Sequence, residues 1–263
     1  MKLAISGKGG VGKTTLSAML AGALAMEGHT VIALDADADS NLASALGVSA
    51  DDPIKPLAEM KEMIEERTGA GQGYGGYFKL NPKVDDIPDT YARRLGNIRL
   101  LVMGGVRHGG DGCLCPAAAV LKALLVHLVL GRDEHIIMDM EAGIEHLGRA
   151  TAASMDALIV VVDPGPWSTQ TALRVQKLAG DIGIRKVFAV ANRVGRDEDL
   201  AGIRERLGSI PLLGSLGVDD RLRAGVIGVG PGGALRPSDA MKAGMGSINA
   251  ILADLKRRLA NAK

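Results

Sequence analysis

The sequence predicts a single α/β domain of the phosphate-loop NTPase class, with a mostly parallel, twisted sheet and helices on both faces. Three observations support this fold. Short apolar runs alternate with helical patterns, which is typical of successive β–α units. Most of these runs are apolar throughout, as strands buried on both faces must be. The first run leads into the glycine-rich stretch GKGGVGKTT, and a helical pattern follows it.

The expected elements follow this alternation along the chain. Strands are predicted at 2–6, 30–35, 98–103, 135–139, 157–163, 186–191 and 209–213. Helices are predicted at 13–27, 39–46, 116–130, 145–154, 167–182 and 198–207. Right-handed crossovers should join the parallel strands.

Two segments depart from the alternation within the single domain expected over 1–263. An insertion at about 50–97 begins with a charged helical piece over 55–68 and continues with many glycines and prolines, so it is either a functional excursion or a surface insertion. A last helix at about 238–259 carries a narrow apolar stripe. Its basic residues cluster at its C-terminal end, which favours docking on the sheet over binding to a membrane surface.

The composition excludes several classes of protein. Of the 263 residues, 47% are hydrophobic and 23% are charged, which is typical of a globular chain. A net charge of +1 would not steer the chain to nucleic acid or an anionic membrane, and 2% aromatic residues leave few surfaces for base stacking. No apolar run is long enough to span a membrane, and no secretory signal is expected. The only two cysteines, Cys113 and Cys115, suit a reducing compartment, so a cytoplasmic location is expected.

The residues from Gly7 to Thr14 fit the phosphate-loop pattern G-x-x-x-x-G-K-[ST]. The backbone N–H groups of such a loop, and the helix N-terminus behind it, bind phosphate oxygens. Lys13 is expected to bridge the β- and γ-phosphates, and Thr14 to hold Mg²⁺. The predicted nucleotide-binding residues of the loop are Gly9, Gly10, Val11, Gly12, Lys13, Thr14 and Thr15. The pattern does not require the second lysine, Lys8.

Carboxylates follow two of the predicted strands, where they would lie beside the nucleotide crevice. Asp37 could orient or deprotonate the attacking water, or bind Mg²⁺ through water. Asp139 ends the strand HIIMD at a position like that of the Walker B aspartate, which belongs to the magnesium shell. Gly143 could offer its backbone N–H to the γ-phosphate. Nearby, Asp39 or Ser40 could simply cap the next helix.

The stretch GKGGVGKTT, with its extra lysine, resembles the deviant Walker A, or SIMIBI-class, ATPases, which include the nitrogenase iron protein, MinD, ParA and ArsA. The resemblance implies that Lys8 reaches across a homodimer to the partner's nucleotide, whereas a lysine that merely faces solvent is the alternative. It matches Asp37 to the switch I aspartate, with Ala38 where the family often has proline. It matches Asn192 to the asparagine that reads adenine, and the loop after Pro211 to the segment that closes over the base. Arg193 and Pro211 are therefore also expected among the nucleotide-binding residues.

Cys113 and Cys115 lie directly before a helical pattern that begins at Pro116. A helix N-terminus lowers the pKa of a thiol and favours the thiolate, a soft ligand for Zn²⁺, Cu⁺, Ni²⁺ or an iron–sulfur cluster. One Cys-x-Cys pair supplies two ligands, and a symmetric dimer would supply four. The alternative is a pair of small buried cysteines. His108 could add a ligand, but a loop histidine without that role is favoured.

The segments FKLNPKVDDIP, NIRLLVMGGV, GCLCP and IIMDMEAGIEHLGR resemble the CooC family, the nickel-insertion accessory ATPases of carbon monoxide dehydrogenase and their acetyl-CoA synthase relatives. The resemblance implies an ATPase that uses ATP and Mg²⁺ and holds Ni²⁺, or alternatively Zn²⁺, at Cys113 and Cys115 across a homodimer. ATP hydrolysis would reset the dimer while a client nickel enzyme matures. Glu141 and Glu145 could contact the client or the metal, or be solvated loop charges.

Two other functions remain compatible with the residues. A MinD- or ParA-like positioning ATPase would act on a membrane or DNA, but it calls for a basic face or a membrane-seeking tail and leaves the cysteines without a role. An electron-transfer ATPase like the nitrogenase iron protein would hold a cluster between subunits, but that family draws its cysteines from two separate segments. The expected partners are therefore a second copy of the chain and a nickel enzyme, with no nucleic acid and no membrane.

Overall fold

The fold is built on one eight-stranded sheet, seen in a computed structural model that describes residues 1–37, 39–70, 78–104, 116–131, 134–141, 152, 155–230 and 234–261. In spatial order the strands are β3 (Arg93–Leu95), β4 (Ile98–Val102), β2 (Val31–Asp35), β5 (His135–Asp139), β1 (Lys2–Gly7), β6 (Ala157–Val162), β7 (Val187–Val194) and β8 (Leu212–Gly217). All neighbours pair in parallel except β3 and β4, which are antiparallel. The predicted α/β fold with a mostly parallel sheet is confirmed.

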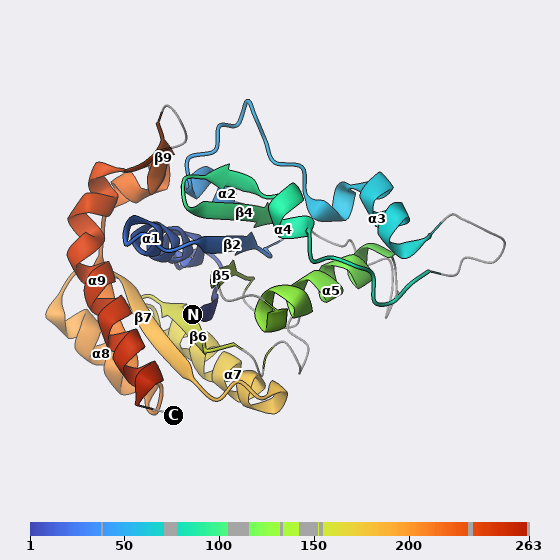
Figure 1. Cartoon of the computed structure of the whole chain (residues 1–263). Helices are drawn as coiled ribbons and strands as arrows, with labels where there is room; N and C mark the ends of the chain where they lie inside the picture. The colour runs from blue at the N-terminus through green and yellow to red at the C-terminus, as the bar shows by residue number, and fades with distance from the viewer. Residues whose placement is uncertain are drawn as a thin grey trace.

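Helices cover both faces of this sheet (Figure 1). One core contains α1 (Lys13–Met26) and α9 (Asp239–Ala260), and the other contains α5 (Pro116–Gly131), α7 (Pro166–Ile182) and α8 (Asp197–Leu207). Strand side chains alternate between the two cores: in β2, Ile32 and Leu34 face the α5 side, whereas Val31 and Ala33 face the α1 side. Because both faces of the strands are covered, the strands are apolar throughout.

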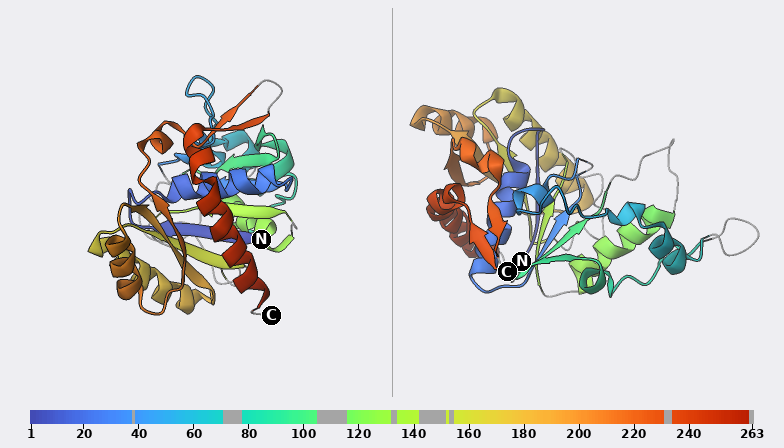
Figure 2. Two further views of the ribbon diagram at one scale, coloured as in Figure 1. Left: turned by 90° about the vertical axis from the view of Figure 1, so that its left-hand side faces the viewer. Right: turned by 90° about the horizontal axis from the view of Figure 1, so that it is seen from above.

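The smaller elements lie at the margins of the sheet. They are α2 (Leu42–Ala45), η1 (Leu57–Glu59), α3 (Lys61–Thr68), α4 (Ile87–Thr90), η2 (Asp220–Ala224) and the antiparallel pair β9 (Ile227–Val229) and β10 (Leu235–Pro237). Helix α3 packs beside α5, away from the strand pair β7 and β8 (Figure 2). The Arg67 guanidinium on α3 donates 2.9 and 2.7 Å hydrogen bonds to Asp86, which fastens the chain before α4 to this helix.

Helix α9 packs against β8 and α1 through the apolar stripe that the sequence indicates. Its buried side chains include Met241, Ile248, Leu252 and Leu255. The Ser238 hydroxyl caps its first turn by accepting a 3.1 Å hydrogen bond from Met241 N. In the part of the chain that the structure describes, no helix is long and apolar enough to cross a membrane.

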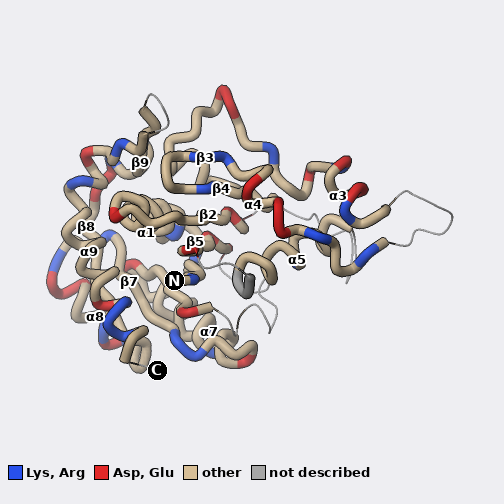
Figure 3. The backbone as a smooth tube through the Cα atoms, viewed as in Figure 1, with Lys and Arg blue, Asp and Glu red and all other residues tan. Residues whose placement is uncertain are grey.

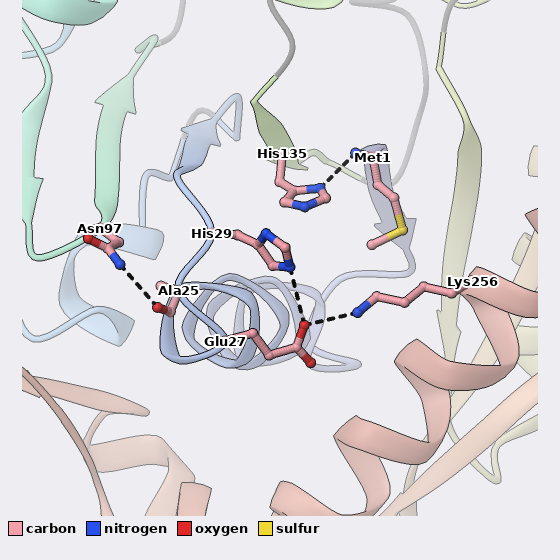
Figure 4. Close-up of polar contacts among 7 residues, drawn as sticks. All are labelled: Met1, Ala25, Glu27, His29, Asn97, His135 and Lys256. Atoms are coloured by element: carbon pink, nitrogen blue, oxygen red, sulfur yellow. Dashed lines mark hydrogen bonds and ion pairs between the residues drawn. The ribbon is translucent and has the colours of Figure 1, made fainter.

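A polar cluster ties four segments together at the amino edge of the sheet (Figure 4). The Met1 amino group lies 2.7 Å from Nδ1 of His135, and the rings of His135 and His29 meet edge to face with centroids 4.5 Å apart. Glu27, just after α1, pairs with His29 at 3.5 Å and with Lys256 of α9 at 2.9 Å. The contacts join β1, the end of α1, β5 and α9 on the side of the sheet opposite to the phosphate loop.

One predicted strand is misplaced along the chain. The expected strand 209–213 is instead β8 (Leu212–Gly217), because Pro211 has no N–H to donate to a strand partner. The Pro211 carbonyl accepts a 2.9 Å hydrogen bond from Ala189 N, and regular pairing begins with the next residue.

Four further expectations need correction or lie outside the described residues. The expected helix 39–46 shrinks to α2 (Leu42–Ala45), because Ser40 adopts a left-handed φ of 36° that a helix excludes. The charged piece 55–68 divides into η1 and α3, since Met60 between them has a ψ of 72°. The expected insertion is partly sheet, because β3 joins the sheet at its edge. The expected helix 145–154 falls outside the described residues apart from position 152.

Candidate nucleotide-binding site

The phosphate loop connects the end of β1 directly to α1. Gly12 is the N-cap of α1 with φ of 99°, and its position leaves the first turn without a side-chain cap. At Gly7 a Cβ would lie 2.5 Å from the Val161 carbonyl oxygen of β6, so only glycine lets the loop leave the sheet here. The uncapped N–H groups of α1 are therefore free to bind an anion such as phosphate.

The loop has an exposed half and a buried half. Lys8, Gly9 and Gly10 are exposed, whereas Val11 is 1% exposed and Lys13 is 7% exposed. The half-buried hydroxyl residues Thr14 and Thr15 follow on the first turn of α1. Lys13 thus lies inside the fold, whereas Lys8 faces out of it.

Asn192, at the end of β7, holds the loop in place. Its Nδ2 donates a 2.8 Å hydrogen bond to the Val11 carbonyl, and the side chain is 6% exposed. A Cβ on Gly12 would lie 2.1 Å from the same Nδ2, so the amide and the loop are in direct contact. The neighbouring Arg193 is exposed, with φ of 57°, where the pairing of β7 and β8 is irregular. Such strained backbone is common at functional sites.

The structure does not bring Pro211 to this edge. Pro211 precedes β8 and pairs with Ala189, three residues before Asn192, so it lies toward the opposite end of the strands. The chain that reaches the phosphate-loop edge is the one that leaves β8 after Gly217. Val218, which is 62% exposed, is an apolar side chain of that segment.

Two fully buried carboxylates face the loop from neighbouring strands. Asp35 and Asp139 end β2 and β5 and pair in register, and both are 0% exposed. Figure 3 marks the acidic positions of the backbone in red, including positions beside the labels of β2 and β5. Burial raises the pKa of Asp35 to about 7, and the nearby Asp139 and Asp37 charges add to this rise. Burial likewise raises the pKa of Asp139 to about 6, against the lowering effect of hydrogen bonds from Thr14 and Ser17 and of the Lys13 charge.

Asp139 is the carboxylate best placed to meet a magnesium ion. Its Oδ1 lies 3.1 Å from the Ser17 hydroxyl, which is also 2.9 Å from the Lys13 carbonyl. Its Oδ2 is buried and has no hydrogen-bond partner among the described residues. A buried carboxylate oxygen without a partner is costly unless a cation binds there. Together with the Thr14 hydroxyl, this oxygen fits the oxygen ligands that Mg²⁺ prefers.

Asp35 and Asp37 shape the turn that follows β2. Asp35 accepts hydrogen bonds from Asp37 N at 3.2 Å and from Leu42 N at 2.9 Å, so it caps α2 from within the core. Asp37 Oδ1 accepts a 3.0 Å hydrogen bond from Asp39 N, and its carbonyl accepts one from the Ser40 hydroxyl at 3.1 Å. The helix cap is thus Asp35 and not Asp39 or Ser40, and the half-buried Asp37 stands at the turn beside the loop.

Several predicted site residues lie outside the described residues. These are His108, Cys113, Cys115, Gly143 and Glu145, together with Ala38. Glu141 is described and exposed, and its carbonyl accepts a 3.0 Å hydrogen bond from the Ser6 hydroxyl. Within the described ranges, no group of three or more His, Cys, Asp or Glu residues could hold a metal ion. The nickel site at the two cysteines stays a prediction.

Residues missed by the sequence analysis include Ser6, Ser17 and the structural role of Asp35. Ser17 carried a usable signal, because it lies one helical turn after Lys13 and so must face the same strand ends. Ser6 and Asp35 needed the strand order before their neighbours could be known.

Comparison with known proteins shows which family shares this sequence. The CobQ/CobB/MinD/ParA nucleotide binding domain matches residues 2–227. The carbon monoxide dehydrogenase accessory protein CooC of Rhodospirillum rubrum is 46% identical over 226 residues, which cover 85% of this chain and 86% of that protein. An ATP-binding protein of Methanocaldococcus jannaschii, itself uncharacterized, is 46% identical over 226 residues, covering 84% and 87% of the two chains.

Solved structures share the fold at low sequence identity. The MinC:MinD cell division protein complex of Aquifex aeolicus includes a chain that matches with a TM-score of 0.64 and 20% identity, covering 98% of this chain and 95% of that one. A ParA family ATPase of Chlorobium tepidum matches with a TM-score of 0.61 and 18% identity, covering 99% and 96%. At this identity the likeness establishes a phosphate-loop NTPase fold of the MinD and ParA type, and nothing finer.

Proposed function

This chain belongs to the CobQ/CobB/MinD/ParA family of nucleotide-binding proteins, and from that premise we propose that it is a nickel-binding ATPase that assists nickel insertion into carbon monoxide dehydrogenase or acetyl-CoA synthase. The observation that carries the ATPase part is the buried Asp139 Oδ2, which has no hydrogen-bond partner among the described residues and lies behind an uncapped phosphate loop. The 46% identity to a carbon monoxide dehydrogenase accessory protein supports the client.

The nucleotide part of the proposal assigns a role to each described side chain. The loop amides and Lys13 bind the β- and γ-phosphates, and Thr14 with Asp139 holds the magnesium ion. Bound magnesium would neutralise charge that develops on the phosphate oxygens. Asp37 orients a water molecule and accepts the proton that this water loses. The water oxygen attacks the γ-phosphorus, while the bond from that phosphorus to the β–γ bridging oxygen breaks. The products are ADP and phosphate.

The base part rests on β7 and β8. We assign the carboxamide oxygen of Asn192 to the adenine amino group, because its nitrogen already donates to the Val11 carbonyl. Base recognition and loop position would then depend on one side chain. Val218 and Arg193 supply exposed surface at the same edge for the base, in place of Pro211.

The metal part of the proposal rests on chemistry and resemblance. Cys113 and Cys115 are the only cysteines, and they directly precede α5, whose N-terminus favours thiolates. Two copies would give four thiolates for Ni²⁺. Lys8 would reach the partner's phosphates, so ATP and metal would both favour the same dimer.

Light scattering on metal-free protein, with and without Ni²⁺ and Mg-ATP, tests the proposal. We expect Ni²⁺ to produce a dimer with one metal per two chains, and the double variant Cys113→Ala/Cys115→Ala not to respond to Ni²⁺. We expect Lys13→Ala to abolish ATP turnover. Dimerisation by ATP alone, with silent cysteines, would refute the metal part and leave a positioning ATPase as the better function. Retained hydrolysis in Lys13→Ala would refute the phosphate-loop argument itself.

A further inference from the structure

Ser17 places a buried hydroxyl in an otherwise apolar stretch of α1. Its side chain is 0% exposed, and every other residue from Leu16 to Ala25 is apolar or glycine. Serine is a poorer helix former than alanine, and burying a hydroxyl costs free energy that an alanine methyl group does not. Alanine would therefore suit both the helix and the core better, which indicates that the hydroxyl itself has a role.

The Ser17 hydroxyl lies within hydrogen-bond distance of two acceptors. Its Oγ is 2.9 Å from the Lys13 carbonyl oxygen, one turn earlier in α1, and 3.1 Å from Asp139 Oδ1 at the end of β5. A hydroxyl has one proton to donate, so it makes one full-strength hydrogen bond at a time. The Lys13 carbonyl is also the regular helical acceptor for the Ser17 N–H, whereas an ionised Asp139 forms the stronger, charge-assisted hydrogen bond.

Thr68 shows what a buried hydroxyl does when it serves only the helix. It is 1% exposed at the end of α3, and its Oγ1 donates a 2.6 Å hydrogen bond to the Ile64 carbonyl, four residues earlier. The same hydroxyl accepts a 3.3 Å hydrogen bond from Ala70 N just after the helix. Ser17 lies inside its helix, and its second contact is with Asp139 instead. The difference indicates that the Ser17 hydroxyl acts on the carboxylate.

The backbone of Asp139 is held on both sides, which leaves its side-chain torsion to be fixed. It pairs in register with Ile5 of β1 and with Asp35 of β2. The last torsion of an aspartate side chain has a broad minimum, so sheet pairing alone does not decide how the carboxylate is turned. Ser17 can decide it, because α1 is a rigid element that also carries Thr14 in its first turn.

The two oxygens of Asp139 have different surroundings. Oδ1 contacts Ser17, whereas Oδ2 is buried and has no hydrogen-bond partner among the described residues. We propose that Ser17 is a positioning residue, which holds Oδ1 and so keeps Oδ2 free to bind the divalent cation of the nucleotide site. The inference rests on the proposed magnesium site at Thr14 and Asp139, and it adds the residue that orients one of the ligands.

Binding of Mn²⁺ tests the proposal, because Mn²⁺ favours the same oxygen ligands as Mg²⁺ and its free ion is measured by electron paramagnetic resonance. We would titrate Mn²⁺ into wild type and Ser17→Ala, with the protein in excess over a non-hydrolysable ATP analogue. Ser17→Ala should weaken Mn²⁺ binding about tenfold or more, as loss of a partner that orients a metal ligand does. Binding of the analogue in EDTA, measured by equilibrium dialysis, should stay within about twofold, because the hydroxyl acts only through the metal ligand.

A double-mutant cycle separates a role through Asp139 from a general effect on α1. Asp139→Asn should itself weaken Mn²⁺ binding. Adding Ser17→Ala to that variant should change the affinity by no more than about twofold, because a positioning residue has no effect once its ligand is lost. Additive losses, as a displaced helix would cause, would contradict the proposal.

Thr68→Val is the matched control, since it removes another buried hydroxyl that donates to a carbonyl four residues earlier. It should leave the Mn²⁺ affinity unchanged. A loss as large as that of Ser17→Ala would overturn the proposal, because removal of any buried helical hydroxyl would then be sufficient.

The remaining outcomes distinguish the role of Ser17 from the proposed function. Equal Mn²⁺ affinity of wild type and Ser17→Ala, with Asp139→Asn weakened, would overturn the positioning role and leave the magnesium site intact. Equal affinity of wild type and Asp139→Asn would remove the metal site from Asp139, and the positioning role with it. If the wild type does not bind the analogue at all, the proposed function itself fails.

Discussion

The difference in unfolding free energy between Asp139→Asn and the wild type, both free of nucleotide, should favour the variant more at neutral pH than at acidic pH. The same replacement should abolish ATP hydrolysis. The Asp139 carboxyl is buried, and its pKa is raised from 3.8 to about 6. The ionised form therefore costs the folded state about 3 kcal/mol. Because the folded state holds the proton more tightly, the stabilisation from protonation is present below pH 3.8 and is lost as the pH rises through about 6.

The contribution of Asp139 to the unfolding free energy can be measured between about pH 5 and about pH 7.5, where it changes by about 1.4 kcal/mol. The asparagine variant lacks it, so the difference in unfolding free energy between variant and wild type should grow by that amount as the pH rises. Loss of the Asp139 charge also removes one cause of the raised pKa of Asp35. Ionised Asp35 then costs the folded variant less, so this effect also favours the variant as the pH rises. The asparagine Oδ1 can still accept from Ser17, so the fold keeps its contact at 3.1 Å.

Urea unfolding of metal-free wild type and Asp139→Asn at both pH values is the assay. Asp156→Asn is the control, because Asp156 is exposed and accepts a 2.9 Å hydrogen bond from Lys2 N. Mg-ATP should stabilise the wild type more than Asp139→Asn. Two results would refute the argument that ionised Asp139 destabilises the fold until a cation binds. One is a difference in unfolding free energy between the two proteins that does not change with pH, and the other is equal stabilisation of both proteins by Mg-ATP.

Four further outcomes follow from single contacts. Asn192→Ala leaves the buried Val11 carbonyl without its donor, so unfolding free energy should fall by about 1–3 kcal/mol and nucleotide affinity should fall with it; unchanged affinity in dialysis would contradict the contact. Gly12→Ala should destabilise by about 2 kcal/mol or more, measured by urea unfolding, because φ of 99° and the amide 2.1 Å away both oppose a Cβ. Asp37→Asn should bind ATP but hydrolyse it about 100-fold more slowly, and normal turnover would move water activation elsewhere. Burial and the neighbouring Met1 amino group lower the pKa of His135 from 6.5 to about 4. The unfolding free energy should therefore fall as the pH drops through this range, by about 1 kcal/mol after solvent screening. His135→Gln should remove this part of the pH dependence of the unfolding free energy.

The sequence alone determined the layered fold and the chemistry of the loop. Strands buried on both faces must be apolar throughout, so the parallel strands were visible as short runs without knowledge of their partners. The loop was equally visible, because a phosphate cradle needs glycine, lysine and threonine at fixed spacing on consecutive residues. The ends of elements were less certain where one residue decides them, as Pro211 and Ser40 show.

Only the tertiary structure decided which distant residues meet the loop. The strand order places β5 between β2 and β1, and so brings Asp35 and Asp139 together from positions 104 residues apart in the chain. Burial then raises the pKa of both carboxyls, which no local pattern could indicate. The strand pairing also places Pro211 at the amino end of β8, whereas the residues after Gly217 leave that strand at its carboxyl end, the end that faces the phosphate loop in a parallel sheet. Local sequence thus set what each segment is, whereas long-range packing set the electrostatics and the neighbours on which its chemistry depends.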